Sequence, residues 1–409
     1  MSAPAASGAT ARVAETLATW AHSLVASDGD LALAERALKD TVAVGVAARE
    51  HRILDVARPL GEAGRWAAAC HVIDFDDLHM ESTTHISTVC VPVALATGGG
   101  ARAYLAGAGV MARLGIALGW RHYSSGWHAT TTSGALAAAV VAGIARGLDA
   151  DGIARAMALA VPLAGGVQRA FGTDAKSLQV GLAADAGIRA AALAASGATA
   201  DPGAVDEWLR LLGGDPVSVA LSGPAVPGGL AIKIYPACYA LQRPISALRA
   251  ALDGVALDPA TVERVEVRTP EAAVQPLIHH APMDGLQGKF SLEYAAATAL
   301  LDDRHGFAEF SDVAVRRPEA QRLIGLVDTI LERSGDWLLA GEVRVAIRTT
   351  RGTYEATLRY PPGSPQRPPS DAEFAEKLDT CLAGSGADAS EITWAGAADL
   401  LRRTLTDPP

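Results

Sequence analysis

A short segment, residues 74–87, gathers the side chains most able to do chemistry. It contains three aspartates and two histidines: Asp74, Asp76, Asp77, His79 and His85. Imidazoles exchange protons near neutral pH, and nearby carboxylates can orient them. We expect residues 78–84 to form an irregular loop and His85 to lie at the entrance of a helix, where its ring can point into a cleft. This arrangement favours acid–base chemistry.

Residues 74–87 allow two other interpretations. A metal ion could be held by His79, His85 and one aspartate, but these residues lack the i, i+4 spacing of ligands on one helix face. Alternatively, the aspartates only cap helices and the histidines only bond to the backbone. Because the ligand spacing is poor, we predict that no metal is bound.

A second polar cluster, residues 123–132, precedes another apolar helix. Trp127 and His128 are followed there by Thr130 and two further threonines. The free amide groups and the positive dipole end of such a helix favour a bound carboxylate. The alternative is that the threonines only cap the helix.

Two lysines, Lys176 and Lys233, stand in apolar surroundings. A lysine in such a setting either extends its ammonium group toward solvent or pairs it with an anion. For either lysine taken alone, extension toward solvent is the simpler expectation.

The overall composition limits the classes of partner. The chain has 409 residues, 50% of them hydrophobic, and a net charge of −10 without a basic block. It therefore has no feature typical of a protein that binds nucleic acid or an anionic membrane. An anionic substrate would need a local basic pocket, because the net charge would repel it. The four cysteines form no C-x-x-C pair and are expected to be buried thiols: Cys70, Cys90, Cys238 and Cys381.

The chain carries no predicted membrane span or secretion signal. Apolar stretches such as residues 133–145 are shorter than the ~20 residues that cross a bilayer, and the N-terminus lacks a basic segment followed by an apolar run. We expect a cytoplasmic protein.

The hydrophobic periodicity changes along the chain. Apolar residues recur at helical spacing from Val13 and again from Leu31, and a helical pattern continues through residues 178–195. Alternation typical of strands appears at residues 264–268 and at 343–360, the latter as a hairpin. A capping-box pattern at Ser370 then begins another helix. We predict a mostly α fold with a smaller α+β lid: residues 1–240 and 371–409 form the helical domain, and 241–370 form the lid.

A glycine motif at residues 107–112 fits G-x-G-x-x-A. No buried strand is predicted before it and no suitable acidic residue follows about 20 positions later, so dinucleotide binding is rejected.

Several motifs, taken in order, resemble the MmgE/PrpD family, which includes 2-methylcitrate dehydratase, cis-aconitate decarboxylase and iminodisuccinate epimerase. The matching segments are residues 74–87, Gly126-Trp127-His128, Lys176 with Gly181 and Ala183-Ala184, residues 233–238, residues 289–294, residues 362–365 and Lys377. The resemblance implies a helical domain joined to a lid, a homodimer, a site in the cleft between the domains, and no metal or organic cofactor.

By position, the resemblance also implies a catalytic set: Asp74, His85, His128, Lys176 and Lys233. The predicted substrate-binding residues are Thr84, Trp127, Thr130, Lys289, Ser291, Tyr235, Gln242 and Arg243. The chain departs from the family pattern at four positions. Leu78 replaces a common Thr, Ile86 a Pro, Gln242 a His and Ser246 an Asp, so the substrate need not be that of the standard dehydratase.

The expected function is that of a lyase. It would remove a proton next to a carboxylate and dehydrate a small di- or tricarboxylic hydroxy acid similar to 2-methylcitrate. An epimerase or isomerase acting on an iminodisuccinate-like acid, and a decarboxylase acting on a cis-aconitate-like acid, are alternatives on the same scaffold. A binding protein without activity is the remaining alternative.

Overall fold

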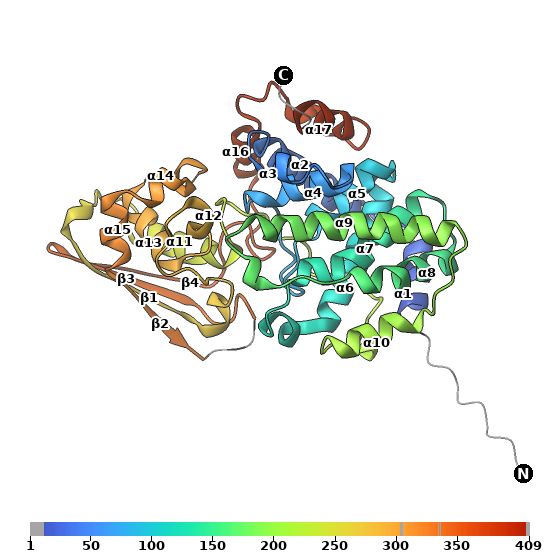
Figure 1. The fold of residues 1–409 in the computed structure, drawn as a ribbon. Helices are drawn as coiled ribbons and strands as arrows, with labels where there is room; N and C mark the ends of the chain where they lie inside the picture. The colour runs from blue at the N-terminus through green and yellow to red at the C-terminus, as the bar shows by residue number, and fades with distance from the viewer. Residues whose placement is uncertain (1–11, 303–305, 334, 336, 406–409) are drawn as a thin grey trace, which may run out of the picture.

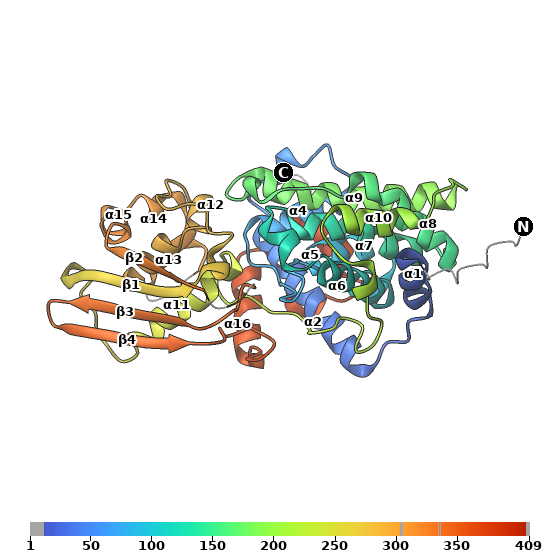
Figure 2. The same cartoon turned by 90° about the horizontal axis from the view of Figure 1, so that it is seen from below.

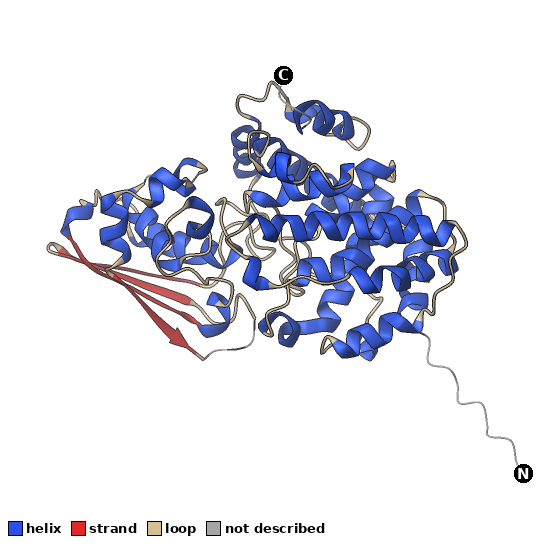
Figure 3. Ribbon diagram, in the orientation of Figure 1, coloured by secondary structure: helices blue, strands red, loops and turns tan. Residues whose placement is uncertain are grey.

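The computed structural model describes residues 12–302, 306–333, 335 and 337–405. A large helical body makes up most of the molecule, and a smaller part with a four-stranded sheet projects from one side (Figures 1 and 3). This arrangement confirms the predicted fold class, a mostly α protein with a smaller α+β part.

The helical body is built around one apolar helix. Its helices are α1 (Val13–Ser23), α2 (Asp28–Ala47), α3 (Ile53–Val56), α4 (Glu62–Val72), α5 (Ser87–Thr97), α6 (Gly100–Ser124), α7 (Ala129–Ala145), α8 (Ala150–Ala160), α9 (Asp174–Ala195) and α10 (Gly203–Leu211). Because α7 is apolar on all sides, it is buried, and it packs against α5, α6, α8 and α9.

Small residues let these helices approach closely. A Cβ atom at Gly107 of α6 would lie 2.2 Å from Cγ2 of Val141 on α7, too close for any side chain. The glycine motif at residues 107–112 thus lies in the middle of a helix and serves helix packing. It is not the turn between a strand and a helix that a dinucleotide-binding motif occupies.

Among the described residues, two helices are long and apolar enough to cross a membrane by length and composition alone, whereas the sequence predicted no membrane span. They are α6 and α9, and 83% and 56% of their most apolar windows are buried within the protein. Both pack against several other helices of the helical body.

The smaller part combines a sheet with short helices. Its helices are α11 (Tyr239–Ala251), α12 (Gly285–Gly288), α13 (Leu292–Leu301), α14 (Asp312–Val315) and α15 (Pro318–Ile324). Its strands are β1 (Val262–Pro270), β2 (Val327–Glu332), β3 (Val343–Thr349) and β4 (Gly352–Leu358), in the order β2-β1-β3-β4. β1 pairs parallel with β2, whereas β3 is antiparallel to both of its neighbours.

The alternating side chains of β3 explain how this sheet is covered. Val343, Val345 and Ile347 are buried on the face that packs against α11, and Arg344 and Arg348 point outward. The predicted hairpin is confirmed, although β4 ends at Leu358 and not at Tyr360. The edge strand β2 was not predicted.

The chain returns to the helical body after the sheet. α16 (Asp371–Leu382) begins with the predicted capping box of Ser370 and Glu373 and packs against α2, and α17 (Ala397–Leu405) also contacts α2 (Figures 1 and 2). Lys377 of α16 reaches the interior, where its Nζ lies 2.6 Å from Oδ1 of Asp40. We keep the proposed division into two domains, with boundaries near residues 240 and 370.

The first prediction concerns this buried ion pair. Lys377→Met should lower the free energy of unfolding by about 3–5 kcal/mol, because it leaves a buried carboxylate without its cation. Adding Asp40→Asn should recover part of the loss. Lys39→Met is the control, because Lys39 forms a half-exposed pair with Glu35 within α2. Loss of that pair should cost under about 1 kcal/mol. Urea unfolding of the variants would measure this, and equal losses from both lysines would contradict it.

Candidate active site

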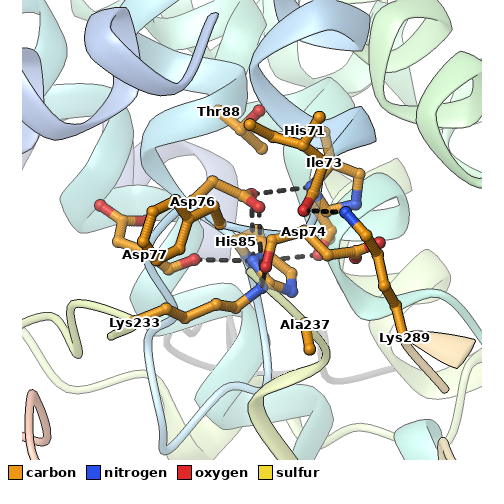
Figure 4. A network of polar contacts seen from close by, with 12 residues as sticks. His71, Ile73, Asp74, Asp76, Asp77, His85, Thr88, Lys233, Ala237 and Lys289 are labelled. Carbon is orange, nitrogen blue, oxygen red and sulfur yellow. Dashed lines mark hydrogen bonds and ion pairs between the residues drawn. The ribbon is translucent and has the colours of Figure 1, made fainter. Parts of the chain in front are cut away.

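A small cavity lies at the junction of the helical body and the smaller part. Residues from both parts line it: Asp74, Leu78, Thr83, His85, Tyr123, His128, Thr130, Phe171, Lys176, Cys238, Tyr239, Phe290 and Leu338. Four members of the predicted catalytic set are among them, namely Asp74, His85, His128 and Lys176. Part of the polar network behind this lining is shown in Figure 4.

The chain turns sharply where α4 ends, and Asp74 sits at this turn. Its φ of 56° lies in the left-handed region, which is costly for a residue with a side chain. The carboxylate accepts a bond from Lys176 (2.6 Å), and the main-chain oxygen accepts one from Lys233 (2.8 Å). Lys289 donates to the preceding carbonyl, that of Ile73, at 2.5 Å. Three lysines from separate segments thus fix this turn.

The same lysines control the charge of Asp74. Burial raises the pKa of its carboxyl, but the ammonium groups of Lys176, Lys233 and Lys289 outweigh burial, so the net pKa lies below its usual value. Asp74 is therefore an anion at neutral pH. Burial also lowers the pKa of Lys289, to about 8.

His85 has a defined tautomer. Its Nδ1 lies 2.6 Å from the main-chain oxygen of Asp77 and 3.1 Å from Oδ2 of Asp76. Because both oxygens only accept, Nδ1 carries the proton and Nε2 keeps a free lone pair. Burial lowers the pKa of His85 to about 4, although Asp76 opposes this shift. The ring is therefore neutral at pH 7 and can act as a base.

His71 was missed by the sequence analysis. Its Nδ1 lies 2.7 Å from Oδ2 of Asp76, and its Nε2 accepts a bond from Lys176 at 2.7 Å. It therefore links the carboxylate that orients His85 to the ammonium group in the cavity. The only signal in the sequence was a lone histidine at the end of an Ala-rich helix, directly before the aspartate cluster.

His128 presents a second free nitrogen. It is the residue before α7, as predicted, and its Nδ1 lies 3.0 Å from Oε1 of Gln179. If Nδ1 donates to this oxygen, Nε2 is left as an acceptor, and it is buried without a partner among the described residues. Burial, together with the charges of His71 and Lys176, holds the pKa of His128 well below its usual value.

The alternative set of metal ligands, His79 and His85 with an aspartate, is not assembled among the described residues, but another set of possible ligands lies nearby. The ring of His79 bonds to Ser82 and to the carbonyl of Pro227. His71, Asp76 and His85 instead offer ligand atoms within 4.8 Å of one another. Those atoms already bond to each other, and an ammonium group, that of Lys233, lies 3.7 Å from Asp76. The donor set therefore suits a hydrogen-bond network better than a cation, and the absence of a metal requirement stays a prediction.

Only some of the predicted substrate-binding residues of the helical body line the cavity. Thr130 lines the cavity, and its Oγ1 accepts the main-chain N–H of His85 at 3.0 Å. Thr84 lies behind the lining and bonds to Ser82, and the neighbouring Thr83 faces the cavity in its place. Trp127 is stacked on His122 at 5.7 Å, outside the lining.

Five further predicted substrate-binding residues also lie outside the cavity lining: Lys289, Ser291, Tyr235, Gln242 and Arg243. Lys233, which was predicted as catalytic, lies outside the lining as well. Gln242 is occupied by the backbone, since Oε1 accepts the N–H groups of Ile234 and Tyr235 and Nε2 donates to the carbonyl of Tyr235. Arg243 donates to the carbonyl oxygens of residues 338, 340, 341 and 359. Ser291 caps α13, and the Tyr235 hydroxyl lies 3.3 Å from that of Ser246. These side chains hold the loops that carry the site.

Three other residues of the cavity lining, Phe171, Phe290 and Tyr239, were not predicted as site residues from the sequence. Phe171 and Phe290 face Lys176, with ring centroids 5.7 and 5.5 Å from its Nζ. Tyr239, the first residue of α11, has a buried hydroxyl without a partner among the described residues.

The fold and the cavity define a class of two-part helical protein with a buried acid–base network at the junction of its parts. Comparison with protein families gives a narrower result. The MmgE/PrpD N-terminal domain matches residues 63–208 and the MmgE/PrpD C-terminal domain matches residues 235–399. The chain belongs to the MmgE/PrpD family, as its motifs had indicated, and this family is generally enzymatic. A comparison with curated proteins finds no match.

The second prediction concerns Asp77, whose pKa is raised to about 7 by burial and by Asp40. The folded protein takes up this proton near pH 7, whereas the unfolded chain does so near pH 3.8. The cost of the buried carboxylate is thus fully present above pH 7 and disappears as the pH falls toward 4. Asp77→Asn should raise the free energy of unfolding by roughly 2 kcal/mol at pH 8 and hardly at pH 4. Urea unfolding at both pH values would test this, and an equal effect at both would contradict it.

Proposed function

We propose that the protein is a lyase that removes a proton next to the carboxylate of a small hydroxy acid and eliminates water. The observation that carries this proposal is the His85 ring, which is neutral, presents Nε2 and lies in the same cavity as the ammonium group of Lys176. The family resemblance favours a di- or tricarboxylic acid similar to 2-methylcitrate.

The proposed reaction starts with transfer of a proton from carbon to Nε2 of His85. The electron pair of the broken C–H bond forms a C=C bond, and the C–O bond to the β-hydroxyl breaks. The departing oxygen takes a proton and leaves as water. Tyr239 is the candidate donor, because its buried hydroxyl lines the cavity and burial raises its pKa, so that it stays protonated. His85 then returns a proton to Tyr239, which restores both groups.

The local charge supports an anionic substrate despite the net charge of −10. Three ammonium groups, those of Lys176, Lys233 and Lys289, surround the two carboxylates of Asp74 and Asp76, whose pKa values are lowered. This leaves a positive balance where negative charge develops on the substrate. The ammonium group of Lys176 can contact that charge, and the other two act through the field they create.

An epimerase is the second candidate, because two imidazoles in one cavity can each present a free Nε2. One would remove a proton and the conjugate acid of the other would return it to the opposite face. A decarboxylase stays possible on the family resemblance alone.

The third prediction tests the two groups that face the cavity. His85→Gln should reduce turnover by ~100-fold or more, the usual scale for a general base. Lys176→Met should lower kcat and raise KM, because the cation meets the carboxylate before and during the reaction. Lys39→Met is the surface control. Reactions in deuterated water followed by mass spectrometry separate water loss from exchange without loss. Normal turnover of both site variants would contradict the proposal.

The fourth prediction is a pH profile. His85 works as a base only when it is neutral, and its pKa is lowered to about 4. kcat/KM should therefore stay level between about pH 5 and 7 and fall about tenfold per pH unit below about 4. An acid limb near pH 6.5 would mean that the base is a histidine with an ordinary pKa. Circular dichroism at each pH would confirm that the protein is folded.

A further inference from the structure

The basic side chains around the cavity differ in what they can offer a ligand. Lys233 and Lys289 lie outside the lining and donate to the carbonyls of Asp74 and Ile73, while Arg243 is occupied by carbonyl oxygens of the smaller part. Among the described residues, Lys176 is the one cation in the cavity lining. Asp74 and His71 already accept two of its three N–H groups, at 2.6 and 2.7 Å. The third N–H group of Lys176 is left to donate a hydrogen bond, and it can bind one carboxylate.

Much of the remaining lining is apolar or aromatic: Leu78, Phe171, Cys238, Phe290 and Leu338. Burial raises the pKa of the Cys238 thiol to about 11, so this residue is neutral. A second carboxylate against this wall would be buried without a cation, which costs several kcal/mol.

Two buried polar atoms in the same cavity have no partner among the described residues. They are the hydroxyl of Tyr239 and Nε2 of His128. Buried polar groups are normally hydrogen-bonded, so atoms left open in a cavity indicate where a ligand bonds. A neutral hydroxyl group, which both donates and accepts, can satisfy such atoms without adding charge.

From these features we infer that the substrate is a hydroxy acid with a single carboxylate and an apolar substituent. The inference rests on the proposed function and narrows its substrate class. The carboxylate meets Lys176, the hydroxyl meets Tyr239 or His128, and the substituent lies against Leu78 and Leu338. It departs from the di- or tricarboxylic acid that the family resemblance favours.

Binding and turnover of matched acids test this inference. Isothermal calorimetry on the full chain would compare 3-hydroxyhexanoate, which has one carboxylate and an alkyl substituent, with malate and citrate. We expect 3-hydroxyhexanoate to bind at least tenfold more tightly than citrate. Tighter or equal binding of citrate would overturn the inference. The same acids are then incubated in deuterated water. Tight binding of 3-hydroxyhexanoate with neither water loss nor deuterium uptake would overturn the proposed function and leave only the preference for a ligand with one carboxylate.

A variant at the apolar wall gives a second test. Leu78→Thr adds a hydroxyl to the wall and should reduce the preference for 3-hydroxyhexanoate over citrate by at least fivefold. Leu193→Thr is the control, because Leu193 is 52% exposed on α9 and is not part of the lining. If Leu78→Thr does not fold, Leu338→Thr tests the same wall from the smaller part. An unchanged preference in a folded variant would overturn the inference.

Discussion

The rest of the site depends on how the turn at Asp74 is held. A left-handed aspartate is unfavourable by itself, and a buried carboxylate is more so. Lys176 neutralises the carboxylate, while Lys233 and Lys289 bond to the two carbonyl oxygens of the turn. Lys289 comes from the smaller part, so the same contacts that offset the cost of this turn also tie the two parts together at the cavity.

His71 and His85 can accept protons or hydrogen bonds at neutral pH because burial lowers their pKa values and keeps both rings neutral. In each ring Nδ1 is bonded to a fixed acceptor, which is the carbonyl of Asp77 for His85 and the carboxylate of Asp76 for His71. The carboxylate of Asp76 therefore orients two rings. His71 in turn accepts a hydrogen bond from Lys176 and so helps to position its ammonium group. Acid–base groups and the cation beside them are thus positioned by one network and not by separate local structures.

Much of the fold could be predicted from the sequence, because hydrophobic periodicity reports directly on helices and half-buried strands. The positions of His85 and His128 at helix entrances could be predicted for the same reason. The edge strand β2 could not, since its side chains are mostly only partly buried and do not alternate clearly. Nor could the backbone contacts of Gln242 and Arg243 or the link made by His71, because residue type does not tell which way a side chain points.

Catalysis in the proposed reaction requires that the His85 ring is neutral and carries its proton on Nδ1, which leaves Nε2 as the base. Nitrogen-15 NMR of histidine side chains reports the tautomer and charge of each ring, and comparison with His85→Gln assigns the signals of this residue. At pH 7 we predict a neutral ring protonated at Nδ1, with no conversion to imidazolium above about pH 5. A ring that is protonated at Nε2, or that carries a charge at pH 7, would contradict the account.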